Sequence, residues 1–567
     1  TSLKKEKVAS FSSEKKGVFS LLFLFFTLFS FAQVTTNSSS GLAATYPSLA
    51  SAITALNGAT ITDPVVITLT GNETAPVGGY SITATGTSTN TITIQGNSST
   101  ITAPAQTSGN LNDAIFKIIG GDWITIQGFT LNERAFTPVA ADTAAGTNTM
   151  TEWGIALLYA TTTNGAQNCT IQNNIIALNR TYQNTFGIYS NSTHSATTIA
   201  TSATATTTAG GNSGLKVYGN TINNVNLGIV VVGPTAAADA NTGIDIGGSS
   251  ISTGNTISNF GTTGTFSGYA NVSGTVNGIL VRNSNGFNVS YNSITSSDGG
   301  VTTGTLNGIQ IQASSNAPTT TFTNTISYNA ISLQSGAATG AINGITYPSG
   351  SASVTSIANV SNNNFTRLNH SVVSSGAITA LSKASGDFTT NISNNTFTNI
   401  SCSTTGSFTF ISHSVTMPTG GSQTISGNSI VTGFTKTGAG GTVTCLTSAG
   451  SSVNGTTATI TNNNFSNITI TGATAITAIS STDYLSSSSI PTKIITNNTF
   501  NSWIGTGGTS AYIGLTASYW AGNSTVNNNT FTNWSGQGAI TAINLGSTGS
   551  IATSISIANN IINNLSS

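Results

Sequence analysis

The sequence predicts an all-β protein built as a parallel β-helix, in which the chain winds into stacked coils. A pattern of Asn, any residue, then Ile or Phe recurs twelve times, at intervals of about 31 to 46 residues. An Ile or Val stands three positions before the Asn in every copy except the one at Asn255. Self-similarity at such a period indicates a solenoid, whose units bury their apolar sides by stacking on one another. The twelve asparagines, called the ladder asparagines below, are Asn174, Asn220, Asn255, Asn292, Asn329, Asn363, Asn395, Asn428, Asn463, Asn498, Asn529 and Asn560.

The residues between the ladder asparagines favour strands over helices. Apolar residues lie two or three positions apart, and Thr, Ser, Gly and Asn fill the intervals. A propeller blade requires a longer repeat, and a calcium-binding roll requires a Gly-rich Asp motif that the chain lacks. A second repeated segment, such as Asn277-Gly278-Ile279, lies upstream of the Asn motifs and adds a strand to each coil. Its middle residue is Gly, Ala or Cys, so we expect a crowded position there, with Cys445 as a small buried residue.

We expect each ladder asparagine to sit at a bend with a left-handed backbone and to bond to the same amide in the next coil. Charged residues make up only 5% of the chain, against about 25% in ordinary soluble domains. This agrees with stacked coils, because like charges about 4.8 Å apart repel by roughly 1 kcal/mol per pair even in water. The alternative is a disordered Ser/Thr/Asn-rich tract, but the strict placement of Ile, Val and Phe disfavours it.

From about residue 42 to its end, the chain resembles the right-handed parallel β-helix proteins of the pectin lyase-like superfamily, especially secreted, Asn/Thr-rich members from Bacteroidota-type bacteria. The Asn repeat carries the resemblance, together with segment 46–57, which looks like the helix that caps the first coil in such proteins. The resemblance implies a right-handed parallel β-helix. We expect its N-terminal cap at residues 42–75 and the β-helix proper at residues 76–567. Two irregular repeats before the first ladder asparagine bring the expected total to roughly 14 coils.

The expected cap consists of a short helix and the first strand. Leu49, Ile53 and Leu56 fall on one helical face, and Pro47 suits the first turn. The strand-forming run Val65–Leu69 follows directly.

Residues 1–32 have the pattern of a signal peptide. Lys15 and Lys16 precede an apolar run at 18–31, and the segment before Gln33 suits cleavage. The run is too short for a membrane anchor, so we expect a secreted or cell-surface protein with no membrane span in the mature chain. The chain begins without Met and stops within a repeat. We therefore expect a fragment that is truncated at the C-terminus.

Charge and cysteine content restrict the partners. Lys and Arg together number 14, as do Asp and Glu, and no basic cluster is present to neutralise nucleic-acid phosphates. We therefore exclude nucleic acid as a partner. The three cysteines show no metal-like spacing, and their odd number in an exported chain argues against a disulfide framework. We expect no metal, no cofactor and a monomeric chain.

A polysaccharide lyase or glycoside hydrolase is the enzymatic alternative. The resemblance implies that such an enzyme would place acidic residues, often with Ca²⁺, beside an Arg or Lys on neighbouring coils. The chain lacks paired Asp-Asp, Arg-Ile-Lys and Gly-His-Gly motifs, and His194, His370 and His413 stand alone in Ser/Thr-rich surroundings, as solvated loop residues do. Mixed charges gather only in the first coils, where surface and cap ion pairs are the simpler interpretation. They are Asp113, Lys117, Asp122, Glu133, Arg134, Asp142 and Glu152.

Binding without catalysis fits the sequence better. Segments 190–214 and 233–250 are longer than their later equivalents, so we expect loops on one side of the N-terminal half, where recognition usually occurs. Tyr519 and Trp520 are the candidate ligand-binding residues, because an exposed aromatic pair can stack on a sugar ring. The alternative is that the pair folds back over the last coils.

Two further tryptophans are not counted as binding residues. Trp503 and Trp534 stand five places after a ladder asparagine, in the position that Leu368, Ile400, Ile468 and Leu565 hold in other repeats. We expect both in the core or at its edge.

We therefore predict an exported cell-surface or extracellular β-helix protein, acting as a non-catalytic, adhesin-like or carbohydrate-contacting structural module whose partners are polysaccharides or cell-surface glycans. Convergence of Asp122, Glu133, Arg134 and Glu152 in one groove would favour the enzyme. Ice binding by a regular Thr array is a second alternative, although no Thr-x-Thr element holds its register throughout the chain.

Overall fold

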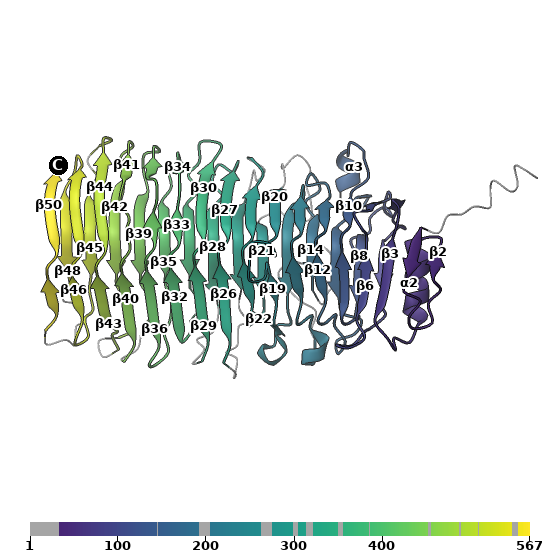
Figure 1. The fold of residues 1–567 in the computed structure, drawn as a ribbon. Coiled ribbons are helices and arrows are strands. Elements are labelled where there is room, and N and C mark those ends of the chain that lie inside the picture. The colour runs from purple at the N-terminus through teal and green to yellow at the C-terminus, as the bar shows by residue number, and fades with distance from the viewer. Residues whose placement is uncertain are drawn as a thin grey trace, which may run out of the picture.

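The computed structural model describes residues 33–567 except for 145, 192–204, 262–274, 299–303, 313–320, 350–354, 385, 452–454, 487–488, 509 and 547–553. The predicted signal peptide, residues 1–32, lies outside the described residues. The described chain forms one elongated stack of coils, with a helix at the N-terminal end and the C-terminus at the other end (Figure 1). No helix in this part of the chain combines the length and the apolar content needed to span a bilayer.

Successive coils pair in parallel and build three long sheets, which we call A, B and C in the order in which the chain visits them. Neighbouring coils keep the register of the repeat: Ile171 pairs with Val217 in sheet A, and Ile176 pairs with Ile222 in sheet B. The prediction of a parallel β-helix is confirmed. Sheet C has 14 strands among the described residues, in agreement with the roughly 14 coils expected.

Sheet A contains the strands that lead into the ladder asparagines. They are β3 (Val65–Leu69), β6 (Ile92–Gln95), β9 (Ile124–Gln127), β12 (Thr170–Gln172), β15 (Lys216–Tyr218), β19 (Asp245–Ile246), β23 (Asn288–Ser290), β26 (Thr323–Ser327), β29 (Ile357–Ser361), β32 (Thr389–Ser393), β36 (Ser422–Ser426), β40 (Thr457–Thr461), β43 (Thr492–Thr496), β46 (Thr525–Asn527) and β49 (Ser556–Ala558).

Sheet B follows the ladder asparagines and bends in the C-terminal half, where the strand segments after the bend form a separate sheet that we call B2. Sheet B consists of β4 (Glu73–Thr74), β7 (Thr100–Thr102), β10 (Thr130–Asn132), β13 (Ile175–Ala177), β16 (Thr221–Asn223), β20 (Thr256–Phe260), β24 (Ser293–Ser296), β27 (Ala330–Ser335), β30 (Asn364–His370), β33 (Thr396–Phe397) and β37 (Ser429–Ile430). Sheet B2 consists of β34 (Ile400–Cys402), β38 (Phe434–Lys436), β41 (Ile468–Ile470), β44 (Thr499–Gly505), β47 (Thr530–Ser535) and β50 (Ile561–Ser566).

Sheet C corresponds to the second repeated segment of the sequence. It consists of β5 (Tyr80–Ile82), β8 (Ala114–Ile119), β11 (Trp153–Leu158), β14 (Phe186–Ser190), β17 (Leu227–Val232), β21 (Thr275–Arg282), β25 (Thr305–Gln312), β28 (Ile342–Ser349), β31 (Ile378–Lys383), β35 (Phe408–His413), β39 (Thr442–Ser448), β42 (Ala475–Ser481), β45 (Tyr512–Ala517) and β48 (Ile540–Leu545). Short elements at the corners are α3 (Ala140–Thr143), η1 (Thr208–Gly210), η2 (Ala237–Asp239), β18 (Asn241–Thr242) and β22 (Ser284–Asn285).

The ladder asparagines form one continuous column inside the corner between sheets A and B. Between every adjacent pair, from Asn174 to Asn560, the side-chain Nδ2 donates to the Oδ1 of the next coil at 2.9–3.1 Å. The same Oδ1 also accepts the backbone N–H of the preceding ladder residue, as Asn463 does from Asn428. Each Nδ2 reaches a backbone carbonyl of the preceding coil as well, as from Asn428 to Ile392. The predicted amide column is confirmed, with its buried polar atoms satisfied.

The left-handed backbone lies one residue before the ladder asparagine, which corrects our expectation. Asn173, Asn362 and Asn462 have φ values of 55°, 56° and 56°, whereas none of the twelve ladder residues has a positive φ. The side chain of the ladder residue must point into the corner to reach its neighbours. The residue before it makes the sharp turn, and its side chain remains outside.

The N-terminal cap is built from a helix and an antiparallel strand. Helix α2 (Leu49–Gly58) begins with a capping box, in which Ser48 accepts from the Ser51 N–H at 3.2 Å, and its Leu49, Ile53 and Leu56 side chains are buried as predicted. Pro47 precedes the N-cap and so lies outside the first turn. Strands β1 (Val34–Thr36) and β2 (Thr45–Tyr46) precede the helix, and β1 pairs antiparallel with β3. The cap therefore covers the open edge of the first coil, and it includes a strand upstream of the predicted boundary at residue 42.

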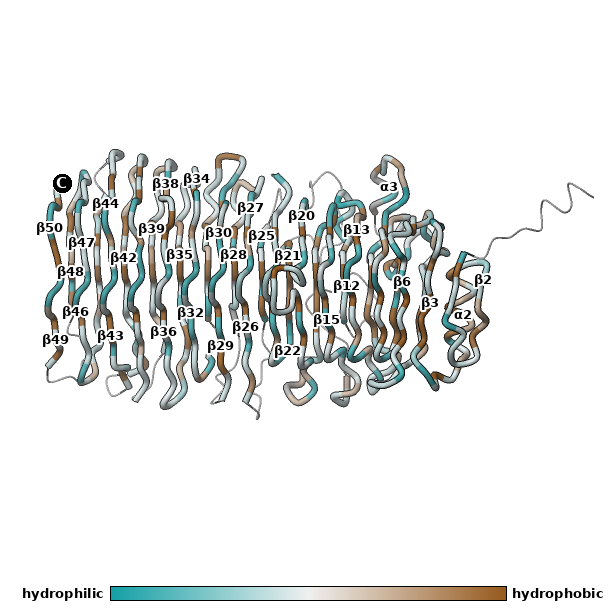
Figure 2. Tube along the Cα trace, viewed as in Figure 1, coloured by the Kyte–Doolittle hydropathy of each residue, from teal (hydrophilic) through white to brown (hydrophobic). Residues whose placement is uncertain are grey.

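Apolar side chains fill the interior along the whole rod. Hydrophobic and hydrophilic residues alternate along the coils in Figure 2, as expected for strands with one buried face. The middle residue of the second repeated segment is crowded, because a Cβ at Gly344 would lie 2.4 Å from the carbonyl oxygen of Ala380. Cys445 occupies an equivalent place and is fully buried as a free thiol, as predicted.

Candidate functional site

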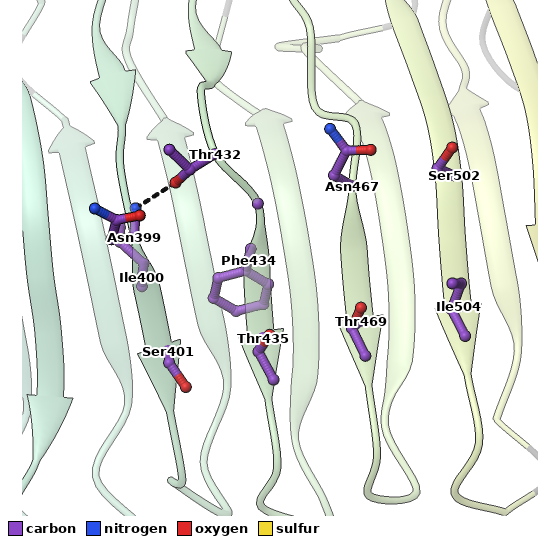
Figure 3. Close-up of a pocket in the computed structure, with 11 residues that line it drawn as sticks. Asn399, Ile400, Ser401, Thr432, Phe434, Thr435, Asn467, Thr469, Ser502 and Ile504 are labelled. Atoms are coloured by element: carbon purple, nitrogen blue, oxygen red, sulfur yellow. Dashed lines mark hydrogen bonds between the residues drawn. The ribbon is translucent and has the colours of Figure 1, made fainter.

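A shallow groove runs over the outer face of sheet B2, where each coil bends. Asn399, Asn467 and Ser502 form this bend with φ values of 55°, 62° and 60°, and each stands four residues after a ladder asparagine. Asn tolerates the left-handed conformation better than most residues. Figure 3 shows these side chains, with that of Thr432, in one row across neighbouring coils.

Alternation along sheet B2 separates a core row from the groove. Ile400, Phe434, Ile468 and Trp503 are paired in register and buried. Trp503 stacks on Trp534 with ring centroids 4.3 Å apart and an interplanar angle of 2°. Both tryptophans therefore belong to the core, as expected.

The floor of the groove is uncharged and mostly polar, with Ile504 as an exposed apolar residue. Ser401, Thr435, Thr469 and Ile504 are aligned in register on the outer face, below the row of bend residues (Figure 3). The depression has a volume of about 510 Å³, and no Asp, Glu, Lys or Arg lines it. Its amides and hydroxyls can hydrogen-bond to a neutral polar ligand. They provide no counter-charge for an anionic one.

A second depression, of about 500 Å³, lies on sheet B over the coils before the groove. Asn259, Thr295, Asp298 and Arg367 are among its lining residues, and Arg367 Nη1 lies 2.6 Å from Asp298 Oδ1. Arg367 and Asn399 each stand four residues after consecutive ladder asparagines. The two depressions therefore lie along one strip that follows the rod axis.

The charged residues of the first coils are divided between two corners. Asp122 lies between β8 and β9, at the corner of sheets C and A, where it accepts the Gln167 N–H at 2.7 Å. Glu133 follows β10 and Glu152 precedes β11, at the corner of sheets B and C. Asp122 thus does not join the other acidic residues in one groove.

Most of these carboxylates cap backbone groups. Glu152 is fully buried and accepts the Asp113 N–H at 2.9 Å and the Tyr182 hydroxyl at 2.6 Å. Glu133 accepts the Thr151 N–H at 2.9 Å. Across the described residues, ion pairs are formed only by Arg367 with Asp298 and by Lys383 with Asp387. The interpretation of the first-coil charges as surface ion pairs is therefore wrong, because their carboxylates accept backbone N–H groups at turns and do not pair with basic side chains.

Asp113 and Glu152 are neighbouring carboxyl groups whose pKa values are both raised. Burial raises the pKa of Asp113, while nearby Lys117 and Asn110 offset part of that rise. Burial also raises the pKa of Glu152 well above its usual range. Neither carboxylate oxygen of Asp113 meets hydrogen-bond geometry with a described group, so its ionised form is poorly stabilised. The pair lies inside the turn, not in an open groove.

The structure separates the two aromatic residues that the sequence singled out at 519–520. Trp520 is 3% exposed, and its indole N–H donates to the Gly546 carbonyl at 2.8 Å. Tyr519 is half-buried and stacks on Tyr484, with centroids 4.1 Å apart. Trp520 thus folds into the last coils, as in the alternative interpretation. Ligand binding by Tyr519 stays a prediction.

The two histidines in the described part of the chain do not behave as solvated loop residues. His370 is 2% exposed and His413 is fully buried at the end of β35, while His194 lies outside the described residues. Burial, with a smaller contribution from Lys383, lowers the pKa of His413 to about 3. His413 therefore stays neutral at ordinary pH. The prediction of solvation was wrong for His370 and His413, because side chains at a coil corner made of Ser and Thr can pack as tightly as those at an apolar corner.

Sequence analysis missed a second apolar layer, which covers the outer face of sheet C in the first coils. Trp153 and Tyr189 stack there at 4.9 Å with an interplanar angle of 7°, and Phe186 packs edge-on against Tyr189. The signal was available: Trp153 and Phe186 precede a Gly-Ile pair, in the slot that Asn277 occupies later in the chain. Of the loop predicted at 190–214, residues 192–204 lie outside the described part of the chain.

Comparisons with known proteins add little. No family model and no curated protein matches this chain. Among solved structures, an alginate lyase of the PL6 family, AlyGC, is 10% identical over 90% of this chain and 98% of its own, with a TM-score of 0.21. A family 28 exopolygalacturonase from Yersinia enterocolitica is 10% identical over 86% of this chain and 72% of its own, with a TM-score of 0.15. At these scores neither similarity supports an inference about function.

Proposed function

We propose that this protein is an exported, non-catalytic rod that binds neutral polysaccharide along the strip formed by sheets B and B2, in an adhesin-like or structural role. The observation that carries the proposal is the uncharged groove of amides and hydroxyls repeated from coil to coil. Parallel strands lie about 4.8 Å apart, which is close to the length of one sugar unit in an extended chain. A rigid periodic rod can therefore present equivalent hydrogen-bonding groups to successive sugars.

The test is a binding screen of the purified protein against neutral glycans and polyuronates, with release of unsaturated products recorded in the same samples. We expect binding to a neutral glycan without cleavage. Cleavage of any polyuronate would instead support the enzymatic alternative, the lyase or hydrolase.

A double variant locates the binding surface. Thr435→Val with Thr469→Val removes two groove hydroxyls while keeping side-chain shape, and we expect roughly tenfold weaker binding. Thr409→Val with Thr444→Val makes the same change in register on the outer face of sheet C and serves as the control. Equal binding by both double variants and the unmodified protein would contradict the groove as the site.

Export to the cell surface is part of the proposal and has its own test. The apolar run at 18–31 followed by Gln33 supports it. We expect expression of the whole chain in a bacterial host to yield a mature N-terminus at Gln33 in the extracellular or envelope fraction. Recovery of the uncleaved chain in the cytoplasm would contradict export.

A further inference from the structure

Two tyrosines occupy a left-handed corner position that other coils give to Asn or Gly. The residue before the ladder asparagine has a positive φ in every coil from Asn174 to Asn560 except that of Asn255. It is Asn or Gly in all of these coils except two consecutive ones, where Tyr291 (φ 61°) and Tyr328 (φ 57°) stand. Bulky residues are rare in this conformation, because Cβ approaches the following carbonyl oxygen. Such strain in neighbouring coils indicates a role beyond the turn itself.

The two rings form an exposed stack at the corner of sheets A and B. Their centroids are 4.7 Å apart with an interplanar angle of 4°, and Tyr328 is 51% exposed. Because Tyr291 covers one face of the Tyr328 ring, the exposed half must come from the opposite face and the rim. That face looks along the rod toward Asn362 and Asn394, which hold the same corner position in the next two coils.

A chain of hydrogen bonds flanks the stack on sheet A. The Ser290 and Ser327 hydroxyls are 2.9 Å apart, and Ser290 donates to Asn288 Oδ1 at 2.6 Å. Asn288 Nδ2 and the Tyr218 hydroxyl donate to the two oxygens of Asp245, at 2.8 Å and 2.6 Å. The carboxylate is thus engaged within the protein, and the Ser290 and Ser327 side chains are buried beside the stack.

The stack also borders the polar strip on sheet B. Thr295 and Ser332 follow Tyr291 and Tyr328 by four residues in the same coils, and both line the depression beside Arg367. The Tyr291–Tyr328 stack and the depression are therefore parts of one continuous surface.

We propose that the exposed face of Tyr328, together with the amides of Asn362 and Asn394, binds one pyranose ring of a neutral glycan. The ring C–H groups pack on the aromatic face, and the sugar hydroxyls bond to the amides. This inference rests on the proposed function and names a subsite within it.

The test is Tyr328→Asn, which installs the residue that most coils use at this position. We expect its melting temperature to be unchanged or higher, because Asn adopts the left-handed conformation with less strain. We expect affinity for the best of three probes, cellohexaose, xylohexaose and mannohexaose, to fall about tenfold, the effect of losing one aromatic stack. Affinity is measured by titration calorimetry, with hexagalacturonate as the anionic comparison.

Thr409→Val with Thr444→Val, on the outer face of sheet C, is the control, and we expect it to leave this affinity unchanged. Wild-type affinity in Tyr328→Asn overturns the subsite alone. A lower melting temperature for Tyr328→Asn also overturns it, since the stack is then a structural feature. If the unmodified protein binds none of the neutral probes, the subsite and the proposed function both fail.

Discussion

At the scale of single residues, position relative to the ladder asparagine decides what a side chain does. The ladder residue itself points inward and is satisfied on all sides, while the residue before it takes the left-handed turn. The residue four positions later bends the chain again and lines the groove, as Asn399 and Asn467 do. The same residue type, Asn, thus serves as a core hydrogen-bonding group, a turn residue and a residue that lines the groove.

Removing one ladder amide should weaken the rod more than removing an amide on its surface. Asn428→Ala breaks bonds to the coils on both sides and leaves buried groups without partners. We expect a loss of about 2 to 4 kcal/mol, seen as a lower urea midpoint. Asn391→Ala removes one outer-face bond to Asn359 and should cost less than about 1 kcal/mol. Equal midpoints for the two variants would contradict the role given to the column.

The buried acidic pair should make the first coils less stable as pH rises above about 4. Because folding raises the pKa of Asp113 and Glu152, their contribution is fully present below their unfolded values of about 4 and is lost as pH rises through the folded values. Asp113→Asn removes the buried negative charge while keeping the size of the side chain. We expect the melting temperature of this variant to exceed that of the unmodified protein at pH 8. At pH 4 we expect the two melting temperatures to be equal. A melting curve with the reverse order would contradict the assignment.

At the scale of elements, the cap and the bends control where the stack begins and where it can bind. Helix α2 and strand β1 cover the first coil, whose edge would otherwise expose unpaired backbone groups. The bend between sheets B and B2 creates the concave surface of the groove. The cap lies before the first repeat, whereas the bend recurs four residues after successive ladder asparagines.

The cap should stabilise the whole N-terminal end. Ile53→Ala opens a cavity in the buried face of α2, and we expect a loss of about 2 to 5 kcal/mol. Thr54→Ala, on the exposed face of the same helix, should change stability by less than about 0.5 kcal/mol. Hydrogen exchange measures this directly, and faster exchange in β1 and β3 of the first variant alone is the expected result. Unchanged protection would show that the first coil does not depend on the helix.

At the scale of the whole molecule, the rod behaves as a series of coils that contact only their neighbours. The parallel register continues from β3 to β50 with one coil per repeat. Long-range order therefore arises from many equivalent local contacts. Loops can vary at the corners without disturbing the stack.

Deletion of one whole coil should leave a folded protein. Removal of residues 463–497 takes out one repeat of 35 residues and lets Asn428 bond directly to Asn498. We expect a soluble chain with an unchanged β-type circular dichroism spectrum and cooperative melting. A 20-residue deletion from the same start breaks the register and should aggregate. Aggregation of both deletions alike would show that the coils are not interchangeable.

The sequence by itself determined the solenoid, its amide column, its core tryptophans and its capping helix, because each depends on spacing that repeats or on a local helical face. It could not place the left-handed residue, the bend of sheets B and B2 or the burial of His413, Trp520 and Glu152. These depend on which residues of neighbouring coils lie beside one another at a corner. The Tyr291–Tyr328 stack is of the same kind: the residues stand 37 positions apart in the chain, and only the parallel register brings their rings to 4.7 Å.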